Sequence, residues 1–186
     1  MKRLLIAAAI AAALPAAAQE TYSVDAAHTV PVFEVKHLGM STQRGMFTKA
    51  SGKITIDRAA KKGNADITID MTSVSTSVSK LNDHLKADDF FGAEKFPTAT
   101  FKGSDFKFEG DKLVSVGGNL TLKGVTKPVT LAVSAFNCGN HPMNKKAMCG
   151  ADASVTIKRS DFGVSYGIPA ISDDVKLSIP VEAFKD

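Results

Sequence analysis

The sequence predicts an all-β domain with one short helix, whose antiparallel strands form a barrel or a sandwich. Apolar and polar residues alternate with period two over most of the chain after residue 18, which is typical of strands with one buried face. Turn-forming stretches such as KKGN and EGDK separate the alternating runs. About eight to ten runs follow one another, a number that suits a barrel or a sandwich.

The alternation also assigns apolar side chains to one face of each run. KITID, ADITIDM, TATF and NLTL are clear examples, and VTLAV, SVTI and VKLSIPV continue the pattern toward the C-terminus. Gly117 and Gly118, next to NLTL, indicate a β-bulge. From this parity we expect an interior face made of Phe33, Val35, Ile54, Ile56, Ile67, Ile69, Phe101, Leu120 and Leu122.

One stretch breaks the period of two. In SVSKLNDHLKADDFFGAEKFP, Leu81 and Leu85 are four residues apart, and Phe90 and Phe91 follow them. This spacing predicts one short helix, followed by a loop that ends at Pro97. We expect Leu85, Phe90 and Phe91 to close one end of the strand assembly.

The N-terminus has the features of a secretory signal peptide. Lys2 and Arg3 precede an uninterrupted apolar run from Leu4 to Leu14, and small residues follow Pro15. A membrane-spanning helix needs about 20 apolar residues, so this run is too short for one. We therefore expect residues 1–18 to be cleaved after Ala18, and residues 19–186 to be one exported domain without a membrane span.

Charge gives no sign of a nucleic-acid partner. The formal net charge is +4, and without Lys2 and Arg3 the 23 basic residues fall to 21, against 19 acidic residues. No block of Lys and Arg remains in residues 19–186.

The two cysteines, Cys138 and Cys149, admit two interpretations. Export to an oxidising compartment favours a disulfide, which would constrain the unfolded chain by about 3 kcal/mol. The alternative is a metal site formed by Cys138, His141 and Cys149, but no fourth ligand is evident. We expect the disulfide and no metal.

The segment GVSYG, residues 163–167, fits the G-x-S-x-G pattern of a serine nucleophile. Such a nucleophile needs a preceding strand and a following helix, and Pro169 is a poor helix start. The usual order also requires a histidine after the serine, whereas the last one is His141. We expect Ser165 to lie in a strand connection and to have no catalytic role. A metal-dependent or serine hydrolase is kept as the alternative function.

Several longer segments, taken in order, resemble one family. They are YSVDAAHTVPVFEVKHLGMSTQRGMF, LNDHLKADDFFGAEKFPTATF, NLTLKGVTKPVTL, IKRSDFGV and ISDDVKLSIPVEA. By these motifs the chain is similar to the YceI-like family of bacterial, lipocalin-like periplasmic proteins. The resemblance implies an elongated antiparallel β-barrel of lipocalin-like shape with a helix near one end.

For function, the resemblance implies that the barrel binds a long apolar molecule such as a polyisoprenoid, an isoprenoid quinone or a fatty-acid-like lipid. No cofactor and no catalytic group is then expected, and some relatives are linked to stress responses. A stress-related module with a solid core and no ligand is an alternative, and a homodimer stays open. His37 and Phe162 are added to the interior residues, and Arg44, in the predicted loop STQRG, and Arg159 are candidate contacts to a head group.

Overall fold

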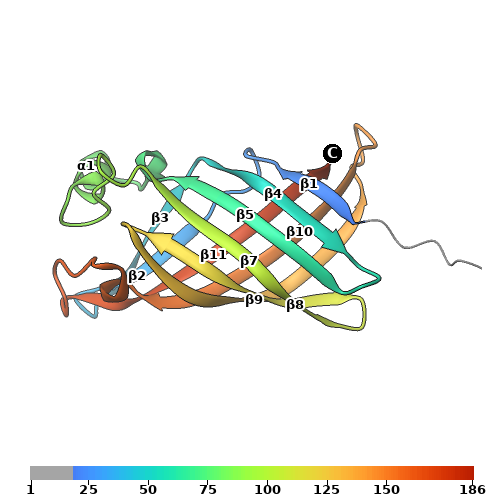
Figure 1. Ribbon diagram of the computed structural model, residues 1–186. Coiled ribbons are helices and arrows are strands. Elements are labelled where there is room, and N and C mark those ends of the chain that lie inside the picture. Colours follow the sequence, from blue (N-terminus) through green and yellow to red (C-terminus); the bar gives the residue numbers. More distant parts are fainter. Residues whose placement is uncertain (1–18) are drawn as a thin grey trace, which may run out of the picture.

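The computed structural model describes residues 19–186, so the predicted signal peptide lies outside the described residues. The described chain forms an elongated barrel of steeply tilted strands (Figure 1). Its strands are β1 (Glu20–Val24), β2 (Val32–His37), β3 (Ser41–Phe47), β4 (Ala50–Asp57), β5 (Lys62–Asp70), β6 (Val74–Ser75), β7 (Thr98–Glu109), β8 (Lys112–Leu122), β9 (Val125–Asn140), β10 (Ala147–Lys158) and β11 (Ile171–Lys185).

The sheet closes on itself. Strands β1, β4, β5, β7, β8, β9, β10 and β11 are neighbours in that order, and β11 pairs with β1 to complete the ring. The end of β11 pairs with β1, as in Tyr22↔Lys185, whereas its first half pairs with β2, as in Leu177↔Phe33. Strand β3 extends β2, and the short β6 pairs with β3. Closure confirms the predicted antiparallel barrel and excludes the sandwich, because a sandwich has two separate sheets.

A β-bulge lies where the two glycines predict one. The register of β7 against β8 shifts between Gly103 and Asp105, opposite Gly117 and Gly118. A Cβ atom on Gly118 would collide with the Lys102 carbonyl of β7, so only glycine fits this close approach. The bulge bends the strand pair and helps the sheet to curl.

Two long connections cover one end of the barrel, which we call the α1 end. The first carries η1 (Met71–Ser73), β6 and the helix α1 (Ser79–Lys86), and the second carries η2 (Arg159–Phe162) and the GVSYG segment. Met71, Leu85, Phe90 and Val164 pack there into one buried cluster. No helix within residues 19–186 has the length and apolar character needed to cross a membrane.

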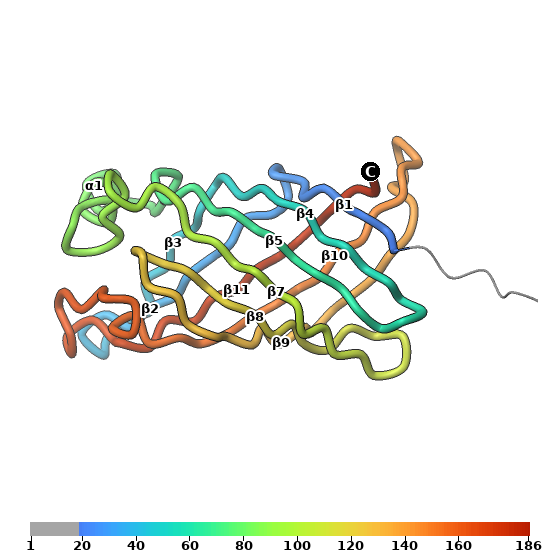
Figure 2. The backbone as a smooth tube through the Cα atoms, in the orientation of Figure 1, coloured from blue at the N-terminus to red at the C-terminus, as the bar shows by residue number. Residues whose placement is uncertain are grey.

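The opposite end, where β1 begins and β11 ends, has a smaller buried cluster of Tyr22, Cys149 and Ala183. The backbone trace shows both chain termini of the described part at this end (Figure 2). The backbone N–H of Asp186 donates to the Thr21 carbonyl at 3.0 Å, which fixes the two terminal segments side by side. We call this the disulfide end.

Candidate functional site

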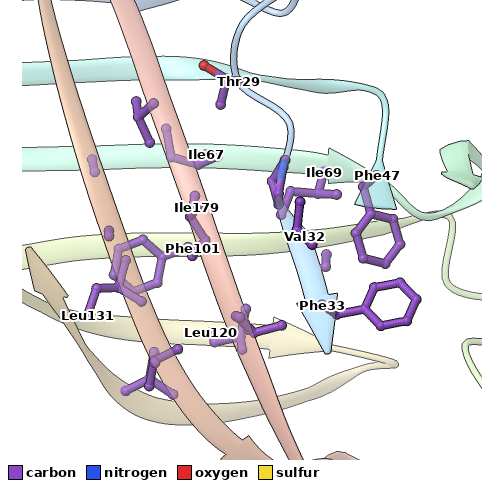
Figure 3. Close-up of a pocket in the computed structure, with 18 of the residues that line it drawn as sticks. Thr29, Val32, Phe33, Phe47, Ile67, Ile69, Phe101, Leu120, Leu131 and Ile179 are labelled. Atoms are coloured by element: carbon purple, nitrogen blue, oxygen red, sulfur yellow. The ribbon is translucent and has the colours of Figure 1, made fainter. Parts of the chain in front are cut away.

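The barrel encloses an apolar cavity of about 240 Å³. Its wall includes Phe47 and Phe90 from the α1 end as well as Tyr22 and Cys149 from the disulfide end, so the cavity runs along the barrel between the two buried clusters. Figure 3 shows side chains from several strands converging on this space. An apolar cavity of roughly 150 Å³ in other proteins stays dry and accepts a ligand as large as benzene.

The wall offers almost no hydrogen-bonding groups to a ligand. Among the described residues, side-chain oxygen or nitrogen atoms in the wall belong to Tyr22, Thr29 and Arg159. The Tyr22 hydroxyl donates to Glu20 Oε2 at 2.7 Å, and Thr29 Oγ1 both donates to the Glu182 carbonyl and accepts from the Glu182 N–H. Because the protein satisfies these groups itself, the space favours an apolar occupant over water.

Arg159 is buried at the α1 end with only 6% of its surface exposed. Its guanidinium donates to the backbone carbonyls of Ser172, Val164, Tyr166 and Ile171 at 2.9 to 3.1 Å. Burial lowers the pKa of this guanidinium, and the Asp173 carboxylate opposes that shift. These bonds hold the connection from Val164 to Ser172 in place. A contact between Arg159 and a ligand head group stays a prediction.

Arg44 lies elsewhere than the sequence suggested. It belongs to strand β3 rather than to a loop, and its side chain is mostly exposed. Its Nε donates to Glu34 Oε1 at 2.9 Å, across the β2–β3 pair. The neighbours of Arg44 in β3 that point inward are Gly45 and Phe47, both buried. Arg44 therefore faces outward and does not line the cavity, which corrects its placement in a loop, and its contact with a head group stays a prediction.

Most residues expected to face the interior do line the cavity. They are Phe33, Val35, Ile54, Ile56, Ile67, Ile69, Leu85, Phe90, Phe91, Phe101, Leu120 and Leu122. Strand parity therefore places the strand residues among them correctly, while Leu85, Phe90 and Phe91 come from α1 and the loop after it. Their contact with a ligand remains a prediction.

Two residues expected in the interior do not line the cavity. His37 shares the parity of Phe33 and Val35 but is exposed, because it ends β2 at the α1 end, beyond the enclosed part of the barrel. Phe162 is only 1% exposed and packs in the main core cluster, but it is absent from the cavity wall. It belongs to η2, where strand parity does not apply.

Many residues of the wall lie outside the set expected from the sequence, chiefly in β9, β10 and β11. The signal was present, since VTLAV, SVTI and VKLSIPV alternate as clearly as the assigned runs. The inward residues of these strands are Val129, Leu131, Val133, Val155, Ile157, Val175, Leu177, Ile179 and Val181.

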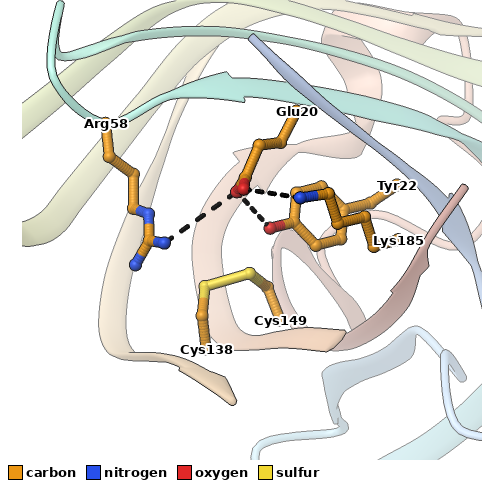
Figure 4. Close-up of a disulfide and its surroundings, with 6 residues drawn as sticks. All are labelled: Glu20, Tyr22, Arg58, Cys138, Cys149 and Lys185. Carbon is orange, nitrogen blue, oxygen red and sulfur yellow. Dashed lines mark hydrogen bonds and ion pairs between the residues drawn. A yellow bond between two sulfur atoms is a disulfide. The ribbon is translucent and has the colours of Figure 1, made fainter. Parts of the chain in front are cut away.

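A disulfide and a polar network close the other end of the cavity (Figure 4). Cys138 and Cys149 are paired across β9 and β10 and form the predicted disulfide, which removes them as metal ligands. Burial raises the pKa of Tyr22 to about 12, and its hydrogen bond to Glu20 adds to this shift. Lys185 and Tyr22, which donate to the Glu20 carboxylate, hold the pKa of that group below its usual range.

The GVSYG segment has none of the surroundings of a nucleophile. Ser165 is exposed and lies in the connection between η2 and β11, with no helix after it. The His84 ring contacts the neighbouring Tyr166 ring edge-on, with centroids 5.3 Å apart. Within residues 19–186, the Ser165 hydroxyl has no hydrogen bond to a histidine or a carboxylate.

One cluster of metal-type ligands is present in the described residues, on the outer surface. Asp25, His28 and Glu182 bring their ligand atoms within 4.8 Å of one another, and none of them lines the cavity. His28 Nδ1 lies 2.6 Å from Asp25 Oδ2, and this bond lowers the pKa of Asp25 and raises that of His28. We interpret the cluster as an exposed ion-pair network.

Comparison with known proteins agrees with this geometry. The sequence model of the YceI-like domain matches residues 22–183. A UPF0312 protein of Pseudomonas paraeruginosa is 36% identical over 193 residues, covering 100% of this chain and 99% of that protein.

Solved structures share the fold. The crystal structure of BcnA from Burkholderia cenocepacia aligns with a TM-score of 0.73 and 28% identity, over 86% of this chain and 98% of that one. A polyisoprenoid binding domain from Saccharophagus degradans aligns with a TM-score of 0.67 and 21% identity, over 89% and 98% of the two chains. The barrel, its cavity and these matches together establish that the chain belongs to the YceI-like family.

Proposed function

We propose that the protein binds one long apolar molecule inside the barrel and carries or sequesters it in the periplasm. The occupant would be a polyisoprenoid, an isoprenoid quinone or a fatty-acid-like lipid. The observation that carries this proposal is the wall itself, where the polar side chains Tyr22, Thr29 and Arg159 are already engaged by the protein.

The energetics are adequate for such a ligand. Transfer of apolar surface out of water contributes about 25 cal/mol per Å² buried. A chain that buries several hundred Å² would therefore gain roughly 5 to 10 kcal/mol before the cost of ordering it. No catalytic group is needed, and the binding role agrees with the polyisoprenoid binding domain of the same fold.

The periplasmic location is supported by two independent features. The predicted signal peptide would direct export, and the Cys138–Cys149 disulfide suits an oxidising compartment.

A titration with a fluorescent polyene fatty acid tests the binding site. Ala153 lines the cavity on β10, whereas Ala132, opposite the next residue Ser154, is exposed on the outside of β9. We expect one probe per barrel, at least tenfold weaker binding by Ala153→Phe, and unchanged binding by the matched control Ala132→Phe. Thermal unfolding of each variant shows that it is folded. Equal binding by folded Ala153→Phe would contradict a site inside the barrel.

A further inference from the structure

Exposed apolar side chains gather at the α1 end. Among residues 19–186, seven large apolar side chains are exposed, and five of them lie at this end: Leu38, Met40, Val78, Tyr166 and Ile168. Of the other two, Met46 is on β3 and Met143 is in the β9–β10 connection at the disulfide end. Clusters of this kind mark surfaces that bind a protein or a membrane.

Two connections present four of these side chains together, and we call Leu38, Met40, Tyr166 and Ile168 the apolar tip. The β2–β3 turn carries Leu38 and Met40, which are 58% and 88% exposed. The Leu38 N–H donates to the Ala170 carbonyl at 2.6 Å, which ties this turn to the connection that carries Tyr166 and Ile168. Figure 1 shows both connections projecting from the α1 end of the barrel.

The apolar tip is continuous with the cavity wall. The Tyr166 ring contacts Phe90, with centroids 5.3 Å apart, and Phe90 lines the cavity. On the other side, the Ile171 N–H donates to the Gly167 carbonyl at 2.8 Å, and Ile171 also lines the cavity. Phe90 and Ile171 therefore connect the apolar tip with the wall of the cavity.

The outer face beside the apolar tip has an excess of positive charge. Lys176, Glu34 and Arg44 form a row across β11, β2 and β3, because the register pairs Glu34 with both of the others. Lys36 follows on β2 and donates to Thr42 Oγ1 at 2.8 Å. Of the acids on the adjoining part of β11, Asp174 is paired with Lys158, whereas Asp173 accepts from the neutral Ser160 and keeps its negative charge. Within this row Arg44 is paired with Glu34, so Lys36 and Lys176 are the two cations without an acidic partner among the described residues.

We propose that the apolar tip docks on the surface of an anionic lipid bilayer, with Lys36, Arg44 and Lys176 facing the lipid phosphates, so that an apolar chain passes between bilayer and cavity. The inference rests on the proposed function, which supplies the transferred chain. Charge complementarity selects the bilayer as the occupant, because exposed apolar side chains flanked by basic residues bind anionic membrane interfaces. A second copy or another protein covering the same residues is the competing outcome.

Vesicle flotation of protein that begins at Gln19 tests the proposal, because residues 1–18 are then unable to contribute to membrane binding. Two methionines provide a matched pair: Met40 is 88% exposed at the apolar tip and Met143 is 86% exposed at the other end. On vesicles that contain phosphatidylglycerol, we expect Met40→Ser to weaken binding about fivefold and the double variant Met40→Ser/Ile168→Ser further. Met143→Ser should bind like the unmodified protein.

The electrostatic part has its own test. Lys176→Gln should weaken binding to these vesicles, whereas Lys112→Gln, at the start of β8, should not. Binding should also fall as NaCl rises from about 0.1 M to about 1 M, because salt screens exposed charges.

Equal binding by the Met40 and Met143 variants, or no binding by the unmodified protein, would overturn the docking proposal. So would a dimer in solution that Met40→Ser dissociates, because a second copy would then cover the tip. If the protein still binds the fluorescent fatty acid in these cases, the proposed binding function holds although the docking proposal fails.

Discussion

The Tyr22 hydroxyl donates a hydrogen bond to Glu20 Oε2 at 2.7 Å while the Tyr22 ring forms part of the cavity wall. The phenol is 4% exposed, and Lys185 donates to the other oxygen of the same carboxylate at 2.8 Å. The end of an apolar cavity is thus joined directly to a charged network at the rim of the barrel. This arrangement stabilises the neutral phenol, because a phenolate would be both buried and next to a carboxylate.

A pH-dependent loss of stability follows. The pKa of Tyr22 is raised to about 12 in the folded protein, above its ordinary value of 10.0. Between these values the unfolded chain loses the phenol proton while the folded protein keeps it, so stability falls as pH rises through this window. We expect the free energy of unfolding, measured with urea, to fall more steeply across this pH window in the unmodified protein than in Tyr22→Phe. The same slope in both proteins would show that Tyr22 titrates normally.

Removal of the disulfide should destabilise the barrel without unfolding it. Cys138 and Cys149 close a short loop, and its loss should lower the free energy of unfolding by about 2 to 4 kcal/mol. The double variant Cys138→Ala/Cys149→Ala and the reduced unmodified protein should have similar unfolding midpoints in urea. Thiol titration of the exported, unfolded protein should find no free cysteine, and two free thiols would refute the disulfide.

Arg159 should be important for stability. In Arg159→Met, the carbonyls of Val164, Tyr166, Ile171 and Ser172 lose their donor in a buried place. We expect the free energy of unfolding to fall by about 3 kcal/mol, the range found when a buried charged hydrogen-bonding group is removed.

The matched control for Arg159 is Arg58→Met. The Arg58 side chain is 56% exposed and lies 3.9 Å from Glu20, so its loss should change stability by less than about 1 kcal/mol. If the two variants lowered the free energy of unfolding equally, this would contradict the proposal that Arg159 stabilises the connection from Val164 to Ser172. Probe binding by Arg159→Met, if it is folded, tests the head-group prediction separately.

Ser165→Ala should have no effect on either stability or chemistry. Ser165 is exposed in a strand connection, and such surface substitutions usually change stability by less than about 0.5 kcal/mol. With short-chain esters as substrates, we expect no turnover by the unmodified protein. Turnover that disappears in Ser165→Ala would instead establish the hydrolase alternative.

The sequence was most informative where strands are regular. Alternate residues of a strand point to the same face, so the period of two correctly places Ile67, Ile69 and Phe101 on the inner wall. The pair Gly117-Gly118 correctly predicts the bulge. It was less informative at the ends of the barrel. His37 keeps the inward parity but has left the enclosed space, and Phe162 sits in a 3₁₀ turn.

Two further features depend on the tertiary structure and not on local pattern. Strand β3, STQRGMF, is too polar to show alternation, and it forms because it pairs with β2 and lies next to the α1 end. This is why the sequence pattern predicts a loop at Arg44. The sequence also does not predict the cavity, because the same inward residues could either fill a small barrel or surround a ligand.

Native mass spectrometry of the protein recovered after export tests the central claim most directly. We expect a mass excess of one apolar molecule per barrel, retained under native conditions and released on unfolding, and reduced in Ala153→Phe but not in Ala132→Phe. A mass equal to that of the chain alone, unchanged after incubation with isoprenoid quinones and fatty acids, would contradict it.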